Sequence, residues 1–440
     1  MSVSVLTPEA QLLLLTAGGP GVDDAIDALF ERDIDWSRLV GLAVRENAVS
    51  VLSGRLGSER ARGLVPAEVA AQLRKLAMVS EFEMRYLEDR LCQALDTLSA
   101  AGIEAILLKG AALGYSVYDS IVERPMADVD LLIRPECAAS ARALLLDAGW
   151  RWDTEGLPDE CYDGHHHLPP LTDAAGTGVQ LELHTALFVE GHPFRLPLEA
   201  VWEHSRALSV CGHSARIPDV HHLLLHLCLH FAWSHVMEVG AWRVVRDVDA
   251  ISARGGVDWD EFGRLAIESR SATSCYWTLC LAKGLVGTPV PGAVLEVLRP
   301  ALPNFVLSSL ERHFLLSLLP GEAGCPSVGL RHVLWEWGVL PGRSGHGAVR
   351  AWHDLPGTRL AAHRASSPRS AGQRLRNHIR QLDAWVTYLR ALVARQEPGA
   401  RRADVRALRR DARVAPAGPL NAVRRVGRPT LVKNYRHGTW

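Results

Sequence analysis

Apolar and polar positions follow three successive patterns along the chain. In residues 1–100 the apolar positions recur at intervals of three and four, as in EFEMRYLEDRLCQALDTLSA, and this spacing predicts amphipathic helices. Thr7-Pro8-Glu9 has the composition of a capped helix start, and Gly102 is placed to end the last of these helices. The first hundred residues are therefore predicted to be helical.

Short aliphatic runs replace this pattern in the next hundred residues. IEAILL (103–108) and ADVDLLI (127–133) predict strands, and the segment 135–150, which begins with proline and ends in Ala-Gly-Trp, predicts a helix. The segment 165–184 predicts two strands around a glycine-rich turn. A small α/β unit is therefore expected between about residues 100 and 210.

Helical spacing resumes in residues 218–235, 242–256 and 258–269, and a further helix is predicted at 373–396. The order of patterns predicts an α+β fold, in which a small mixed β-sheet core is flanked by extensive helical regions. The expected parts are an N-terminal helical region (1–100), the α/β core (101–210), a helical domain (211–340), and a helical and basic C-terminal region with a poorly ordered tail (341–440).

Composition narrows the class of protein. A chain of 440 residues, 48% of them hydrophobic, is long enough for two or three domains, and its net charge of −1 provides no overall field to attract nucleic acid or a membrane. The most apolar long stretch, residues 221–242, carries five histidines and one glutamate, so we interpret it as a buried helix rather than a membrane span. Because the first residues also lack the basic segment of a secretory signal, a cytoplasmic protein without a membrane partner is expected.

The cysteines predict no zinc ribbon and no thioredoxin-type motif, because none of the eight forms a Cys-x-x-Cys pair. They lie in apolar stretches, where we expect buried, reduced thiols. They are Cys92, Cys137, Cys161, Cys211, Cys228, Cys275, Cys280 and Cys325.

The last 45 residues, from Gln396, carry eleven Lys or Arg residues against three acidic ones. A basic segment interrupted by proline and glycine is expected to be solvated or loosely ordered. An electrostatic grip on RNA or on an acidic peptide is the less favoured alternative, because aromatic residues are not interleaved with the basic ones.

Two carboxylates open the strand predicted at 127–133. Side chains alternate between the faces of a strand, so Asp128 and Asp130 share one face, and Glu182 and His184 share a face of the segment VQLELH. Carboxylates this close share a proton or bind a cation, and hard divalent ions prefer oxygen ligands. Asp128, Asp130 and Glu182 are therefore the predicted metal-binding set, suited to Mg²⁺ or Mn²⁺.

A phosphate site is predicted at the end of the preceding strand. Lys109 and Gly110 stand where that strand stops and a helix begins, and the N–H groups of a helix start favour anions. Lys109 adds a point charge, and Arg124 could reach a phosphate oxygen with its forked guanidinium. Lys109, Gly110, Arg124 and His184 are the predicted substrate-binding residues.

Each assignment has a structural alternative. The aspartate pair could be a cap at a strand entrance, Lys109 could be the solvated end of a strand, and Arg124 could pair with Asp128. For His184 we favour a hydrogen-bonding role beside the metal ligands over ligation itself.

The run His165, His166 and His167, with Cys161 nearby, raises the question of a zinc site. Consecutive side chains of a strand point to opposite faces, so at most two of these rings are expected to converge. A polar strand that faces the cleft is the favoured interpretation, without zinc.

The motifs LKGAAL, RPMADVDLLI, LELH, LLLHLCLHFAWSH and DVDAI…DWDEF, in this order, resemble the bacterial group known as uncharacterised family-5 nucleotidyltransferases, within the polymerase-β-type superfamily. The resemblance covers about residues 85–270. It departs from the superfamily at large, which has Gly-Ser or Gly-Gly in place of Lys109-Gly110, and the loop from Gly110 to Asp128 is longer than usual. Both departures belong to the family-5 pattern.

The resemblance implies a metal-dependent transfer of a nucleoside monophosphate from an NTP, such as ATP, to an acceptor, with release of pyrophosphate. Asp128 and Asp130 would hold the metal ions, Glu182 would hold one of them and assist deprotonation of the acceptor, and Gly110 would line the triphosphate site. Asp247 matches a further family position, where it would orient the acceptor or form a local network with Arg243. We favour the network.

The expected function is thus that of a metal-dependent nucleotidyltransferase. The acceptor is not encoded by any motif, and a small molecule, a peptide and a protein remain open, with a role in natural-product or peptide tailoring suggested by the resemblance. A nucleic-acid partner is not favoured. The alternative function is a non-catalytic NTP-binding module that regulates a partner or interacts with peptide or RNA.

Overall fold

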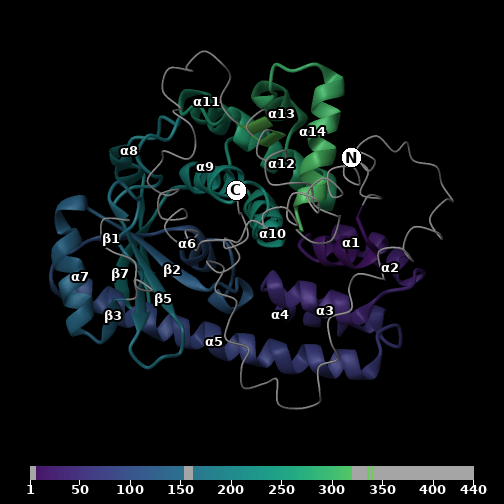
Figure 1. Cartoon of the computed structure of the whole chain (residues 1–440), viewed down its shortest axis with the longest axis horizontal. Helices are drawn as coiled ribbons and strands as arrows, with labels where there is room; N and C mark the ends of the chain where they lie inside the picture. The colour runs from purple at the N-terminus through teal and green to yellow at the C-terminus, as the bar shows by residue number, and fades with distance from the viewer. Residues whose placement is uncertain (1–5, 153–161, 320–333, 336–337, 340–440) are drawn as a thin grey trace, which may run out of the picture.

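A seven-stranded mixed β-sheet, flanked by helices, forms the centre of the computed structural model, which describes residues 6–152, 162–319, 334–335 and 338–339 (Figure 1). The sheet and its helices confirm the α+β class. The helix predicted at 373–396 and the basic tail lie outside the described residues.

The N-terminal region is helical, as its periodicity predicts. Thr7 caps the first helix by accepting a hydrogen bond at Oγ1 from the backbone N–H of Ala10 (3.3 Å), and Gly102 follows the last helix in a left-handed conformation (φ 71°). The helices are α1 (Pro8–Leu15), α2 (Asp23–Phe30), α3 (Trp36–Arg45), α4 (Val49–Leu56) and α5 (Ala67–Ala100), with 3₁₀ turns η2 (Pro20–Val22) and η3 (Glu59–Ala61).

The long helix α5 joins the two sides of the molecule. It packs against α4 at one end and against helix α7 (Ala138–Asp147) and strand β7 (His213–Ile217) of the sheet at the other, so it runs beneath both the N-terminal helices and the sheet (Figure 1). Its buried side chains include Met84, Leu87, Leu91 and Leu95, which follow the spacing of three and four in the sequence.

The strand order of the sheet is β3-β4-β5-β2-β1-β7-β6. Its strands are β1 (Ala105–Leu107), β2 (Asp128–Ile133), β3 (Trp150–Trp152), β4 (Leu171–Asp173), β5 (Gln180–His184), β6 (Arg206–Val210) and β7 (His213–Ile217). β2 pairs in parallel with β5 and antiparallel with β1, while β1 pairs in parallel with β7. The strands predicted at 103–108 and 127–133 are confirmed, and so are two strands within 165–184, of which the first begins only at Leu171.

Short helices connect the strands. These are α6 (Lys109–Ser116) and η4 (Ile121–Glu123) between β1 and β2, η5 (Pro135–Cys137) and α7 (Ala138–Asp147) between β2 and β3, and α8 (Leu198–Glu203) before β6. Because β1 ends at Leu107 and α6 begins at Lys109, the first turn of α6 lies directly at the end of a central strand.

The remaining helices gather on one side of the sheet, above it in Figure 1. They are α9 (Val220–Leu229), which continues into a π-helical turn (His230–Ser234), then α10 (Ala241–Arg254), α11 (Trp259–Glu268), α12 (Ala272–Val286), α13 (Gly292–Leu298) and α14 (Asn304–Ser317). α9 contacts α6, which places this helical layer next to the start of α6. Within the described residues, none of the helices combines the length and the apolar character needed to cross a membrane.

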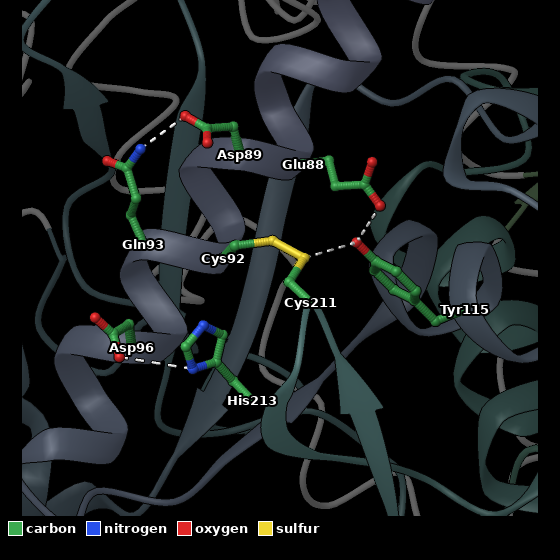
Figure 2. The surroundings of a disulfide bond; sticks show 8 residues. All are labelled: Glu88, Asp89, Cys92, Gln93, Asp96, Tyr115, Cys211 and His213. Carbon is green, nitrogen blue, oxygen red and sulfur yellow. Dashed lines mark hydrogen bonds and ion pairs between the residues drawn. A yellow bond between two sulfur atoms is a disulfide. The ribbon is translucent and has the colours of Figure 1, made fainter.

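A disulfide between Cys92 and Cys211 fastens α5 to the turn between β6 and β7 (Figure 2). The hydroxyl group of Tyr115 lies beside it and donates a hydrogen bond to Glu88 (2.8 Å). The expectation of reduced thiols throughout is therefore wrong for this pair, since its members are 119 residues apart and only the fold brings them together. Cys137, Cys228, Cys275 and Cys280 are free thiols, and the other two cysteines lie outside the described residues.

Candidate functional site

Asp130 and Glu182 lie directly opposite each other on the parallel strands β2 and β5. Asp128 stands opposite Gln180 in the same register, and the alternation of side chains places it on the same face. The three predicted carboxylates therefore converge on one patch of the sheet. Asp130 is buried and Glu182 nearly so, with side chains 4% and 12% exposed.

His184 extends this face by one further position and connects two of the carboxylates. Its Nε2 lies 2.8 Å from Oδ1 of Asp130 and 3.5 Å from Oε2 of Glu182. Burial and Lys109 lower the pKa of this imidazole, but its hydrogen bonds to Asp130 and Glu182 outweigh them and raise the pKa above its ordinary value. Such an imidazole donates its Nε2–H to Asp130, attracts Glu182 by its charge, and so holds both carboxylates in place.

Lys109 provides the compensating positive charge. Its Nζ donates a hydrogen bond of 2.7 Å to Oδ1 of Asp130. Burial lowers the pKa of this ammonium group, but the carboxylates Asp130, Glu182 and Asp128 raise it by more, so the group is charged at neutral pH. Lys109 has a left-handed backbone (φ 46°), which a non-glycine residue adopts at a cost of about 1–3 kcal/mol. Lys109 is thus a buried ion-pair partner, and the alternative of a solvated strand end is wrong.

The three carboxylates titrate differently because only Asp130 and Glu182 have partners. Burial, reinforced by Asp130 and Glu182, raises the pKa of Asp128 to about 6. Burial also raises the pKa of Asp130, but Lys109 and His184 more than reverse this and hold it at about 2. Glu182 likewise has a pKa well below its usual range, because His167, His184 and Lys109 outweigh its burial. The side chain of Asp128 has no hydrogen bond or ion pair within the described part of the chain, and the charges of Lys109 and Arg243 lower its pKa by less than burial and the other carboxylates raise it.

This donor set fits a hard divalent cation. One ligand atom each from Asp130, Glu182 and His184 lie within 4.8 Å of one another, and the unpaired Asp128 stands two residues from Asp130 on the same face. Carboxylate oxygens are the ligands that Mg²⁺ and Mn²⁺ prefer, and an excess of negative charge favours such an ion. The set that comes together includes His184 as well as the three predicted carboxylates.

Arg124 is held by a carboxylate that lies far away in the sequence. Its Nε and Nη2 donate hydrogen bonds of 2.8 and 2.7 Å to the two oxygens of Asp247, on α10. Tyr118 donates a third hydrogen bond to Asp247 (2.8 Å), and both Arg124 and Asp247 are buried. The ion-pair partner of Arg124 is therefore Asp247 and not Asp128. Asp247 has the favoured network role, although its partners are Arg124 and Tyr118 in place of Arg243.

Gly110 lies tightly against this pair. A Cβ atom at residue 110 would lie 3.2 Å from Nη1 of Arg124 and 3.2 Å from Sδ of Met126, closer than nearly all such contacts. The first turn of α6 thus sits directly against Arg124, and the Arg124–Asp247 pair supports the helix start that faces Asp130.

Three further histidines stand beside Glu182. Each of His165, His166 and His167 places one ring nitrogen within 4.8 Å of the others, and Nε2 of His167 lies 3.7 Å from Oε2 of Glu182. The expectation that at most two rings converge is wrong, because the chain bends at His166 and only His167 makes a β-bridge, to His184. Gly164 before the run and two prolines soon after it were the sequence signal for a turn. Cys161 lies outside the described residues.

Comparison with known proteins assigns the chain to a family. A family model described as uncharacterised nucleotidyltransferase matches residues 32–287, more than half of the chain, and includes the whole sheet and the carboxylate face. The chain belongs to this family, as its motifs predict, and is a transferase of phosphorus-containing groups with a general nucleotidyl-transfer role and an NTP as its donor. No curated protein and no solved structure matches it.

Proposed function

We propose that this nucleotidyltransferase moves a nucleoside monophosphate from an NTP to an acceptor in a reaction that depends on Mg²⁺ or Mn²⁺. One observation carries the proposal. Asp130 and Glu182 face each other across two parallel strands, with the unpaired Asp128 on the same face. Lys109 and His184 pair with Asp130 and Glu182 but leave Asp128 without a partner, so a cation would stabilise the cluster, and oxygen ligands select a hard one.

Asp128, Asp130 and Glu182 are proposed as the residues that hold the cation. When bound, the ion neutralises charge on the phosphate oxygens, as divalent ions do in phosphoryl transfer. His184 keeps the carboxylates in position through its two contacts with Asp130 and Glu182. It is therefore a positioning residue in this scheme.

Lys109 and Gly110 are proposed to contact the phosphates. The first N–H groups of α6 have no partners within the helix and attract anions, and Gly110 lies in this first turn. The ammonium group of Lys109 lies near this helix start, where it donates a hydrogen bond to Asp130. A phosphate oxygen is also an anionic acceptor, so the same group could donate to a phosphate bound there.

Arg124 is proposed to act through Gly110. Its guanidinium is engaged by Asp247 and lies against the first turn of α6. It therefore supports the first turn of α6, which is proposed to bind phosphate. Removal of the guanidinium would displace that turn. A guanidinium in this role stabilises the folded chain, whereas a direct contact with phosphate would affect NTP binding at unchanged stability.

Calorimetric titration with each NTP in the presence of Mg²⁺ tests the proposal. The full chain is compared with an Asp128→Asn/Asp130→Asn variant and with a matched control, Asp89→Asn/Asp96→Asn, which removes two exposed aspartates of α5. We expect Mg²⁺-dependent binding of one or more NTPs that the first variant loses and the control keeps. Binding that survives in the first variant, or that needs no divalent ion, would refute the assignment of the carboxylates.

Turnover requires an acceptor, which we propose to be a small molecule, a peptide or a protein, as in tailoring of a natural product or peptide. Release of pyrophosphate during a screen of these classes would identify it. NTP binding that is lost with the aspartates but gives no pyrophosphate with any acceptor would favour the non-catalytic NTP-binding function instead.

A further inference from the structure

The three consecutive histidines form a compact group, which we call the histidine cluster (His165, His166 and His167). The ring centroids lie 4.3 Å apart for His165 and His166, 4.2 Å for His165 and His167, and 4.8 Å for His166 and His167. One ring nitrogen from each lies within 4.8 Å of the others. The three rings thus lie close enough together for one nitrogen of each to reach a single ion.

A hydrogen bond holds His167 in the orientation that is usual for a histidine bound to a metal ion. Nδ1 of His167 lies 2.7 Å from the backbone oxygen of Leu168, so it carries the proton and leaves the lone pair on Nε2. A backbone carbonyl on the far ring nitrogen is the usual support of a metal-bound histidine. Nδ1 of His166 is buried and has no hydrogen-bond partner, which is rare for a buried polar atom.

We propose that His165, His166 and His167 bind a transition-metal ion of the Zn²⁺ class, at a site separate from the carboxylate patch on β2 and β5. Imidazole nitrogens select Zn²⁺ and similar ions, whereas Mg²⁺ prefers oxygen. Three imidazoles with one further position are a common Zn²⁺ arrangement, and Glu182 is the nearest further donor, 3.7 Å from Nε2 of His167. Glu182 thus stands between two sites of different chemical preference.

The histidine cluster is accessible from the surface. His165 lines a cavity of about 490 Å³ together with Phe188, His192 and Phe194. The cavity provides a path for an ion to reach the rings. It also supplies a control residue, because His192 lines the same cavity without belonging to the cluster.

Metal binding by the full chain, prepared without a histidine tag, tests the proposal. The protein is stripped with a chelator, and Zn²⁺ is titrated against a chromophoric competitor in buffer that contains excess Mg²⁺. We expect about one tightly bound Zn²⁺ per chain, as for a single three-histidine site. Substitution of Co²⁺ should give visible absorption bands that report nitrogen coordination.

Two variants of the cluster, His165→Ala and His166→Ala, should each weaken Zn²⁺ binding by at least about 10-fold, the effect that loss of even an outer partner has on a metal site. His192→Ala should bind as the wild type does, and so should Asp128→Asn/Asp130→Asn. Circular dichroism checks that each variant is folded. Wild-type affinity in both cluster variants, loss of Zn²⁺ binding only in the aspartate variant, or displacement of Zn²⁺ by Mg²⁺ would overturn the proposal.

Discussion

Nζ of Lys109 donates a 2.7 Å hydrogen bond to Oδ1 of Asp130 from a backbone that is left-handed, with φ at 46°. The two features occur at one place, because Lys109 is the first residue of α6 and only Leu108 separates it from the end of β1. Strain of this kind persists only where surrounding interactions maintain it, and the buried ion pair is such an interaction.

Replacing Lys109 should separate these two contributions. Lys109→Ala leaves Asp130 buried without its cation and retains the strained backbone, so we expect a loss of about 3 kcal/mol in the free energy of unfolding. Lys109→Gly loses the same ion pair but adopts φ > 0 freely, and should be about 1 kcal/mol more stable than the alanine variant. Urea unfolding in buffer free of divalent ions measures both. Equal stability of the two variants would show that the backbone is unstrained.

Asp128→Asn should stabilise the protein without metal at neutral pH. Burial and its neighbours Asp130 and Glu182 raise the pKa of Asp128 from 3.8 to about 6, so the folded state holds this proton more tightly than the unfolded state does. The folded state therefore loses stability as the pH rises from about 4 to about 6, and the full penalty remains above that window.

The gain from Asp128→Asn should accordingly be absent near pH 4 and reach up to about 3 kcal/mol at pH 7, since one pKa unit corresponds to about 1.4 kcal/mol. Thermal unfolding across this pH range measures it, with the exposed Asp33→Asn as a variant that should show no such trend. Saturating Mn²⁺ should reverse the sign, because only the wild type gains stability from the ion. A stabilisation that does not depend on pH would contradict the argument.

The pair Arg124–Asp247 should behave as a structural unit. Arg124→Lys cannot reproduce the two-pronged hydrogen bond to Asp247, and Asp247→Asn leaves a buried guanidinium without its anion. We expect each single change to cost about 3–5 kcal/mol. The double variant Arg124→Met/Asp247→Leu should cost less than the sum, which a double-mutant cycle by urea unfolding would show. If Arg124→Lys instead weakened NTP binding at unchanged stability, a direct phosphate contact would be indicated.

The disulfide between Cys92 and Cys211 should contribute to stability, because it closes a loop of 119 residues. We expect Cys92→Ser/Cys211→Ser to lower the free energy of unfolding by about 2–4 kcal/mol. Cys137→Ser, which changes a free thiol, should have little effect. A digest under non-reducing conditions should contain the linked peptides. Thiol titration that finds both cysteines free in the native protein would exclude the bond.

Local periodicity was sufficient to predict which acidic side chains share a face of a strand. Asp128 and Asp130 are two residues apart in a strand, and the same alternation applies to Glu182 and His184, so each pair had to share a face whatever the rest of the chain did. The end of β1 at the lysine–glycine step and the start of α6 followed from equally local signals. The same local rule failed at His165 and His166, where the backbone bends and strand alternation does not apply.

The sequence by itself determined the order of elements, the α+β class and which acidic side chains share a face within each strand, since these depend on residues a few positions apart. The pairing of β2 with β5 then brought the two faces together. Only the tertiary structure decided the partner of each charge. Arg124 forms an ion pair with Asp247, 123 residues away, and Lys109 forms one with Asp130. Cys92 forms a disulfide with Cys211. The physical reason is that periodicity specifies which face a side chain occupies, whereas the partner it meets there depends on how distant elements pack.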